Sequence, residues 1–193
     1  ESAKKDSRAG LTFKEMGREV ILSQYGELHD LSRSLFSPFD VEPLHDMRIA
    51  AKRLRYSLEH FSPSFGEELR ELAKEIAALQ SSLGELHDCD VWIDDLGKRL
   101  KARERAALSN SATSEQVAEE ASDFWLLQHF VKERTEHYDD ALARWTEWKA
   151  TGFYTKLNEY LREAPSEKSE PEADDDESRA VSEQASDKEE INR

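Results

Sequence analysis

Apolar residues recur every three or four positions through most of this chain of 193 residues, the spacing that places them on one face of an α-helix. No segment of useful length shows the apolar–polar alternation that is typical of a β-strand. The pattern predicts helices over about residues 11–36, 44–60, 67–107, 114–149 and 153–161. Short connections favour antiparallel neighbours, so we expect an all-α bundle of four main helices and a short C-terminal one.

Proline and glycine set the expected ends of these helices. Ser37-Pro38-Phe39-Asp40 ends the first helix, because proline disfavours helical backbone in the residue before it. Pro43 suits the first turn of the second helix, where a missing N–H costs nothing, and Ser62-Pro63-Ser64 is expected to end that helix. We also expect a bend near Gly84 and a cap of the fourth helix at Ser114.

Three of the predicted helices have an apolar face that we expect to pack in the core. On the first helix this face holds Phe13, Met16, Val20, Leu31 and Leu35. On the second helix it holds Met47, Ala51, Leu54, Leu58 and Phe61. On the fourth helix it holds Leu127, Val131, Tyr138, Leu142 and Trp145.

A row of basic residues lies next to the apolar face of the second helix. His45, Arg48, Lys52 and Arg55 are spaced three, four and three positions apart. At about 100° of turn per residue, they fall within a stripe about 80° wide. Because the whole chain has a net charge of -15, a cationic row held against the core predicts a site for an anionic ligand.

The alternative is that the row is simply a solvated face. Like charges at these spacings cost only about 0.2 to 0.5 kcal/mol per pair, so repulsion does not decide between the two. Composition favours a site, because Glu59 is the one acid on that face of an acid-rich chain. Ile49 and Tyr56 border the row on one side and the core face borders it on the other, so we expect it to lie in a groove.

Acidic residues are concentrated towards the C-terminus. Residues 164–193 contain 11 acidic and 4 basic residues, a net charge of -7 that leaves -8 for residues 1–163. We expect a flexible segment at 1–10, a helical bundle at 11–163 and a disordered acidic tail at 164–193. Two roles are open for the tail, an intramolecular competitor for the basic row or a solubilising extension. The second role is the commoner one for acidic low-complexity segments.

Three further basic residues are candidates for the same anion site. Arg134 falls in the middle of the apolar face of the fourth helix, where it needs an anion or a structural salt bridge, for example to Glu75 or Asp88. Lys74 can reach the same centre from the third helix, although a lone helical lysine is usually solvated. Arg18 lies on a mixed face of the first helix, and such a face is more often surface than site.

Composition excludes several classes of protein. No apolar run is long enough to cross a bilayer, and no secretory signal pattern is present. The single cysteine, Cys89, fits a reducing cytoplasm, and Glu1 in place of an initiator methionine suggests a piece of a longer chain. A net acidic chain argues against broad nucleic-acid binding, which usually shows as a basic surface. It does not argue against a local anion site.

An enzyme is the main alternative from another class. The pairs Asp88 with Asp90 and Asp94 with Asp95 can hold Mg²⁺ for phosphate hydrolysis, but acid pairs in so acidic a chain are usually solvated. There is no glycine-rich phosphate loop, nucleophile–base pair or His/Cys cluster with metal spacing. We therefore expect a non-catalytic protein with no cofactor and no metal.

Two weaker alternatives use histidine and tryptophan. His29, His45, His60 and His87 are too scattered along the chain to predict a metal site. Trp125, Trp145 and Trp148 can face a protein partner if the bundle is an adaptor, but helical tryptophans more often lie in a core.

Two segments each carry a distinctive motif. His45-Asp46-Met47-Arg48-Ile49-Ala50-Ala51-Lys52-Arg53-Leu54-Arg55-Tyr56 contains a histidine, an arginine three positions later and a Lys/Arg-Arg-x-Arg run. Leu83-Gly84-Glu85-Leu86-His87-Asp88, followed by Val91, contains a Leu-Gly-x-x-(basic)-Asp signature. Over about residues 11–162 the chain thereby resembles the CHAD family, the α-helical domains named for their histidines.

The resemblance implies a helical domain that binds inorganic polyphosphate through a basic central surface. Family members occur alone or beside triphosphate-tunnel domains, some associate with polyphosphate granules, and metal chelation by the histidines is an earlier suggestion. Carried over residue by residue, the resemblance assigns polyphosphate contacts to His45, Arg48, Lys52, Arg53 and Arg55. By helical geometry, Arg53 points away from the other four.

The chain departs from the family pattern in two ways. Family domains commonly have two helical repeats facing each other across a basic pore, whereas this chain has one, whose segment 52–59 resembles the second, C-terminal repeat. Either the chain is a piece of a longer two-repeat protein, or the single repeat works alone, or it pairs with another copy or a second repeat. His87 stands where an arginine often precedes the aspartate, which weakens a peripheral contact.

The expected function is therefore non-catalytic binding of polyphosphate by a cytoplasmic, granule-associated domain. The alternatives are a phosphate-processing or metal-binding helical domain, or an accessory domain of a triphosphate-tunnel enzyme.

Overall fold

The computed structural model describes residues 11–107 and 114–163. Its elements are α1 (Phe13–Leu31), the 3₁₀ helix η2 (Ser32–Phe36), α2 (Val41–Phe65), α3 (Glu67–Ala107), α4 (Ser114–Thr151) and α5 (Phe153–Glu163). These ranges contain helices and no strand, which confirms the all-α fold predicted from the sequence. The predictions for residues 1–10 and 164–193 concern parts of the chain outside the described residues.

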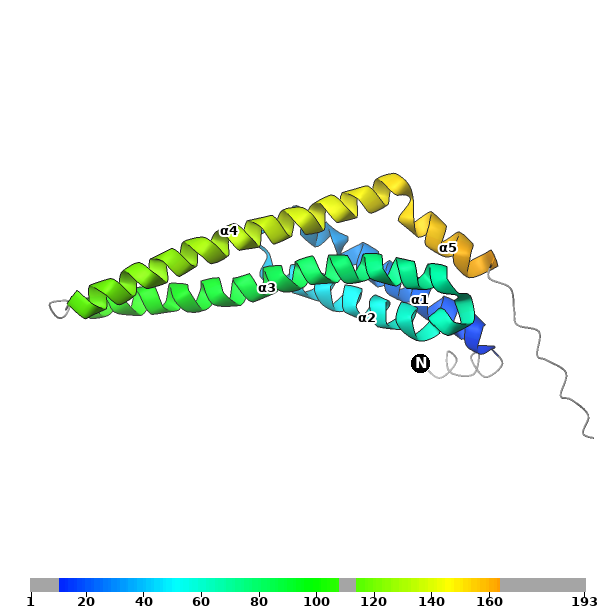
Figure 1. Ribbon diagram of the computed structural model, residues 1–193, viewed down its shortest axis with the longest axis horizontal. Helices are drawn as coiled ribbons and strands as arrows, with labels where there is room; N and C mark the ends of the chain where they lie inside the picture. Colours follow the sequence, from blue (N-terminus) through cyan, green and yellow to red (C-terminus); the bar gives the residue numbers. More distant parts are fainter. Residues whose placement is uncertain (1–10, 108–113, 164–193) are drawn as a thin grey trace, which may run out of the picture.

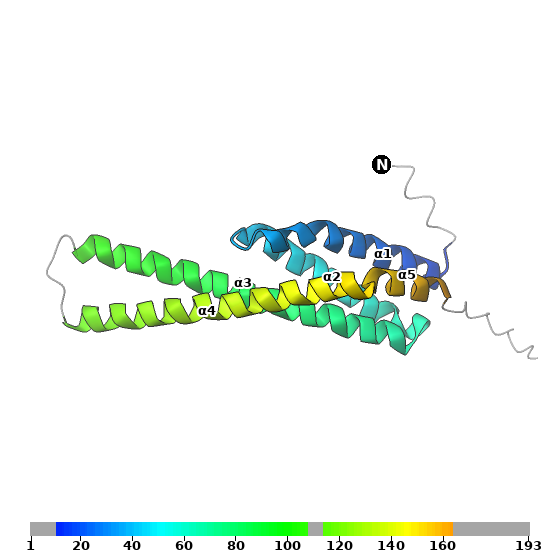
Figure 2. The same cartoon turned by 90° about the horizontal axis from the view of Figure 1, so that it is seen from above.

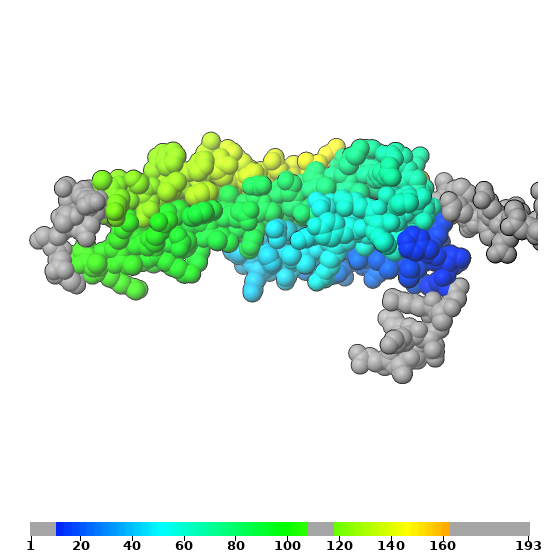
Figure 3. Space-filling view, turned by 60° about the horizontal axis from the view of Figure 1, so that its bottom comes forward, coloured from blue at the N-terminus to red at the C-terminus, as the bar shows by residue number. Residues whose placement is uncertain are grey.

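The long helix α3 runs the length of the molecule, and α4 returns beside it (Figures 1 and 2). α1 and α2 pack at one end only, so the other halves of α3 and α4 form a two-helix arm. We define this arm as residues 91–107 and 114–133, the part beyond the ion pair of Asp90 and Arg134. The space-filling view shows α2 and α3 side by side on one face of the bundle (Figure 3).

The core lies at the end of the molecule where all the helices meet. Its largest fully buried side chains are Ile21, Leu28, Leu35, Leu44, Met47, Leu54, Leu58, Leu69, Ile76, Leu79, Leu83 and Trp145. α5 adds Phe153, Leu157 and Leu161 to this cluster. The predicted core face of α2 is confirmed, because Met47, Ala51, Leu54, Leu58 and Phe61 are all buried.

The predicted core face of α1 is confirmed only in part. Leu35 is buried, and Val20 and Leu31 pack against the core. Phe13 and Met16 are 47% and 39% exposed, whereas Gly17, Ile21, Tyr25 and Leu28 are buried. The reason is the close approach of α1 to α2 at Gly17, where a Cβ atom would lie 2.6 Å from Cδ1 of Phe61. A glycine at the centre of the packed face contributes nothing to an apolar pattern. The helix also ends at Leu31 and continues as η2, rather than running as one α-helix to residue 36.

α2 does not end at Pro63 as predicted but continues to Phe65. A proline at position 63 lacks the N–H that would donate to the carbonyl oxygen of Glu59, four residues earlier. The hydroxyl group of Ser62 donates to that carbonyl oxygen instead, at 2.9 Å. Gly66 then ends the helix with φ of 115°, in the left-handed region that favours glycine, and α3 begins at the next residue.

α3 has the predicted bounds and is helical without interruption at Gly84. α4 and α5 run two residues beyond their predicted ends. The predicted core face of α4 is buried only in its second half, since Trp145 is buried whereas Val131 is 47% exposed. The first half lies on the arm, where α3 alone packs against it.

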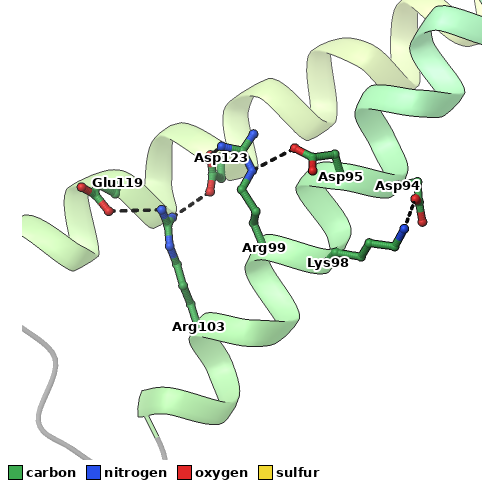
Figure 4. A network of polar contacts seen from close by, with 7 residues as sticks. All are labelled: Asp94, Asp95, Lys98, Arg99, Arg103, Glu119 and Asp123. Carbon is green, nitrogen blue, oxygen red and sulfur yellow. Dashed lines mark hydrogen bonds and ion pairs between the residues drawn. The ribbon is translucent and has the colours of Figure 1, made fainter.

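Part of the arm interior is charged rather than apolar (Figure 4). The carboxylate of Asp123, which is 5% exposed, accepts a hydrogen bond from Nη1 of Arg103 at 2.7 Å. Arg99 also reaches it, with Nη1 3.7 Å from Oδ1. Arg103 in turn donates to Glu119 at 3.1 Å. Two arginines of α3 thus meet two acids of α4 across the arm.

The tryptophans divide between core and surface. Trp145 and Trp148 are buried, as expected for helical tryptophans, whereas Trp125 on the arm is 64% exposed.

Candidate functional site

The basic row of α2 lies beside the core face, as predicted. His45, Arg48 and Arg55 are half-buried, and Lys52 is exposed. Half-buried cations on a helix lie against a neighbouring element rather than standing free in solvent. The neighbour in this case is α3, which packs antiparallel to α2 (Figure 3).

α3 brings two residues to this row. The imidazole rings of His45 and His87 have their centroids 4.3 Å apart. A Cβ atom at Gly84 would lie 3.5 Å from Nε of Arg48, so the arginine passes directly over this glycine. We call His45, Arg48, Lys52, Arg55 and His87 the basic face. The sequence motif around Gly84 and His87 indicated that this part of α3 belongs to the site, but it predicted only a peripheral contact for His87.

Several polar atoms of the basic face are buried without a hydrogen-bond partner in residues 11–107 and 114–163. They include Nδ1 of His45, Nδ1 of His87 and Nε of Arg48. Nε of Arg55 belongs to the same group, because it lies 3.2 Å from Oε1 of Glu59 but its N–H does not point at that oxygen. The Nε–H groups of Arg48 and Arg55 are donors, whereas Nδ1 of a neutral histidine donates in only one of its two tautomers. A buried donor left without a partner costs about 1 to 3 kcal/mol, so this face favours a ligand that accepts hydrogen bonds.

Acidic partners are scarce at the basic face. Among the described residues Arg48 and Lys52 form no ion pair, and Arg55 pairs with Glu59. The cations of Lys52 and Arg55 lie 5.8 and 4.8 Å from the centre of the Tyr56 ring. Such contacts leave the positive charge available, since cation–π attraction at exposed sites is only about 0.5 to 1 kcal/mol.

The pKa of His87 is lowered from its ordinary value. Burial of the imidazole is the main cause, and the neighbouring His45 and Arg48 act in the same direction. Asp88 and Asp90 oppose the shift. His87 is therefore held neutral near pH 7, and an anion bound beside it would favour its protonated form.

Arg53 does not belong to the basic face. Its Nη1 donates to Oε1 of Glu27 on α1 at 2.8 Å. It lines a pocket of about 590 Å³ together with Asp30 and Asp46, which gives that pocket an acidic rim. The helical geometry predicted this direction, while the resemblance alone placed Arg53 among the polyphosphate contacts.

Arg134 has a structural environment. It is 12% exposed, its Nε donates to Oδ1 of Asp90 at 2.5 Å, and its Nη2 donates to the carbonyl oxygen of Pro38 at 2.6 Å. The suggested partners Glu75 and Asp88 are wrong, since Asp90 takes that place. Arg134 ties α4 to α3 and to the segment before α2.

Lys74 pairs with Glu71 at 2.6 Å. Because α3 runs antiparallel to α2 and His87 lies beside His45, Lys74 lies near the level of Leu58, roughly one helical turn beyond Arg55. Arg18 follows Gly17, which packs against Phe61 near the far end of α2. The places of Lys74 and Arg18 in the site stay predictions.

The acidic residues considered for Mg²⁺ are largely paired with cations. Asp90 pairs with Arg134, Asp94 with Lys98 at 2.5 Å and Asp95 with Arg99 at 3.2 Å. Among the described residues, no group of three or more His, Cys, Asp or Glu side chains is arranged to hold a metal ion.

The fold and this face define an all-α helical-bundle protein with a cationic row between two of its helices. The family model of the CHAD domain matches residues 2–97, which include α1, η2, α2 and the first part of α3. The chain belongs to the CHAD domain family, and the match contains the whole basic face. α4 and α5 lie outside the matched residues.

No curated protein and no solved structure matches the chain significantly. In the described ranges, no helix combines the length and apolar character needed to cross a membrane.

Proposed function

We propose that this CHAD domain binds inorganic polyphosphate through the basic face, without turning it over. The observation that carries the proposal is the set of buried nitrogen atoms on His45, Arg48 and His87 that have no partner among the described residues. The same face contains three cations, and two of them, Arg48 and Lys52, form no ion pair in the described structure. A polyanion rich in acceptor oxygens supplies what this surface lacks.

The chemistry of the side chains suits phosphate. An arginine can present two N–H groups to two oxygens of one phosphate, whereas a lysine acts as a point charge. Each contact releases counterions from the polyanion, so affinity falls with salt by a log–log slope of about 0.7 per contact, as for single-stranded nucleic acids. Three permanent cations in a row therefore predict salt-sensitive binding.

The proposal extends to biological context through the family resemblance. We place the domain in the cytoplasm, in association with polyphosphate granules, and we expect a second repeat or a second copy of the chain to close over the basic face. The concave groove expected from the sequence also stays a prediction.

A titration with long-chain polyphosphate at several salt concentrations tests the function, with phosphate release measured alongside. Salt-steep binding without release is the expected result. Release that depends on Mg²⁺ would establish a phosphate-processing enzyme instead, and absence of binding at low salt would refute both.

Substitutions test the site. Arg48→Gln and Lys52→Gln should each weaken binding several-fold and reduce the salt slope by about 0.7. Arg53→Gln is the matched control, because it removes the same charge from the same helix but from the side that faces Glu27. Equal losses in all three variants would show that net charge, and not the basic face, determines binding.

A further inference from the structure

The described chain ends beside the junction of α2 and α3. In α5 the hydroxyl group of Tyr160 donates to the carbonyl oxygen of Phe65 and lies 3.2 Å from Oε2 of Glu68. α5 ends one turn later, at the end of the bundle where α2 meets α3 (Figure 1). Residues 164–193, with their net charge of -7, therefore begin near the C-terminal end of the helix that bears the basic face.

The length of this acidic segment exceeds the distance to the basic face. Arg55 and His45 lie 10 and 20 positions before Phe65, which is roughly 15 and 30 Å along the axis of α2. Thirty residues can span roughly 100 Å when fully extended, so the segment is long enough to reach every residue of the basic face.

Charge favours the basic face over other parts of the surface. Many other basic side chains already have an acidic partner, among them Arg53, Arg70, Lys74, Lys98, Arg99, Arg103 and Arg134. Of the acids that the structure describes, Glu59 alone forms an ion pair with the basic face, and it pairs with Arg55. The basic face therefore offers cations without an acidic partner among the described residues, which an added carboxylate can pair with.

We propose that residues 164–193 bind the basic face of their own chain and compete with polyphosphate for it. This inference rests on the proposed function, because it assigns regulation to the same site. The densest acidic run of residues 164–193 is Asp174-Asp175-Asp176-Glu177, which is flanked by alanine and serine. Polyphosphate carries charge on every unit and displaces such a segment, whereas short anions with few contacts do not. The segment thereby selects long polyanions.

The test uses the full chain with a charge-matched control. One variant carries D174N, D175N, D176N and E177Q in the acidic segment. The control carries D139N, D140N, E147Q and E159Q, exposed acids of α4 and α5 outside the basic face, so both variants lose four negative charges. We expect the first variant to bind polyphosphate about five-fold more tightly than the control at low salt, with the difference vanishing at high salt. It should also gain more affinity for orthophosphate and triphosphate than the control does.

A second measurement needs no polyphosphate. Backbone amide NMR shifts of the unmodified chain and the tail variant should differ at residues 45–55 and 80–87, and much less in the control. If the shifts coincide at these residues, or if both variants gain affinity equally, the inference is overturned. If no form binds polyphosphate while the shifts differ, the tail contact stands and the proposed function fails.

Discussion

At the scale of single residues, His87 changes the description of the site. The sequence motif treats it as a substitute for arginine at the edge of the site. Its ring lies against that of His45, with centroids 4.3 Å apart, and its Nδ1 is buried with no hydrogen-bond partner in the described part of the chain. A neutral histidine at this position accommodates Arg48, and a protonated one adds a charge when an anion arrives. We therefore expect anion binding at the basic face to depend on pH as well as on salt.

Because its pKa is lowered in the folded protein, His87 should make stability and binding depend on pH in opposite directions. Below about pH 6.5 the unfolded chain binds a proton at His87 more readily than the folded chain does. The free energy of unfolding should therefore decrease as the pH is lowered. Bound polyphosphate favours the protonated imidazole, so affinity should rise over the same range. Both trends can be measured between about pH 5 and 7.5, a range that brackets the ordinary histidine pKa of about 6.5. Chemical unfolding measures the stability and a polyphosphate titration measures the affinity.

His87→Gln should flatten both trends, while His60→Gln on the exposed side of α2 should leave them unchanged. His45→Ala should also weaken binding, and an unchanged affinity in that variant would remove His45 from the site. Identical pH profiles for His87→Gln and the unmodified chain would assign the pH response to other groups.

At the scale of elements, the same helical spacing predicted the core face of α2 correctly and that of α1 only in part. In α2 nearly all the buried positions are apolar, so the periodic pattern coincides with the core face. In α1 the packed face centres on Gly17, which allows Phe61 to approach and leaves Phe13 and Met16 at the margin. Pro63 misled the prediction for a similar reason, because the hydroxyl group of Ser62 satisfies the carbonyl that proline leaves free. The periodic pattern of a sequence reveals where large apolar side chains recur. It does not reveal where two helices approach closely at a glycine, or where a side chain replaces a missing backbone hydrogen bond.

Two glycines of α1 offer a matched test of this packing. Gly17→Ala should destabilise the protein by about 1 to 3 kcal/mol, because the new methyl group would overlap the Phe61 ring. Gly26→Ala meets nothing within 4 Å and should stabilise it by about 0.5 to 1 kcal/mol through helix propensity. Urea unfolding of both variants measures the difference. Stabilisation in both would mean that α1 does not approach α2 at Gly17.

At the scale of the whole molecule, the sequence predicts features that are local to one helix but not the contacts between residues far apart in the chain. The row on α2 is local and could be read from one helix. Arg134 was recognised as needing a partner, but Asp90 and Pro38 lie 44 and 96 positions away in the chain. Which acid meets an arginine across two helices depends on their relative rotation and rise, and single-sequence spacing does not contain that information.

Arg134→Met tests whether this residue is structural or belongs to the site. It should lower the free energy of unfolding by about 3 kcal/mol, because it leaves the poorly exposed carboxylate of Asp90 uncompensated. Polyphosphate affinity of the folded protein should change less than two-fold. Adding Asp90→Asn should restore part of the stability, and Lys98→Met, which removes an exposed pair, should cost about 0 to 1 kcal/mol. A large loss of affinity in folded Arg134→Met would return Arg134 to the site.

The connection of α2 to α3 through Gly66 alone has a consequence for folding order. Helices joined by one residue pay almost no loop-closure entropy, and their contacts are local in sequence, which favours rapid folding. The side chains of the basic face span residues 45–87, so this hairpin contains all of them. During synthesis the hairpin emerges before α4 and α5. We therefore expect a nascent chain to present its binding surface before the acidic residues 164–193 have been translated.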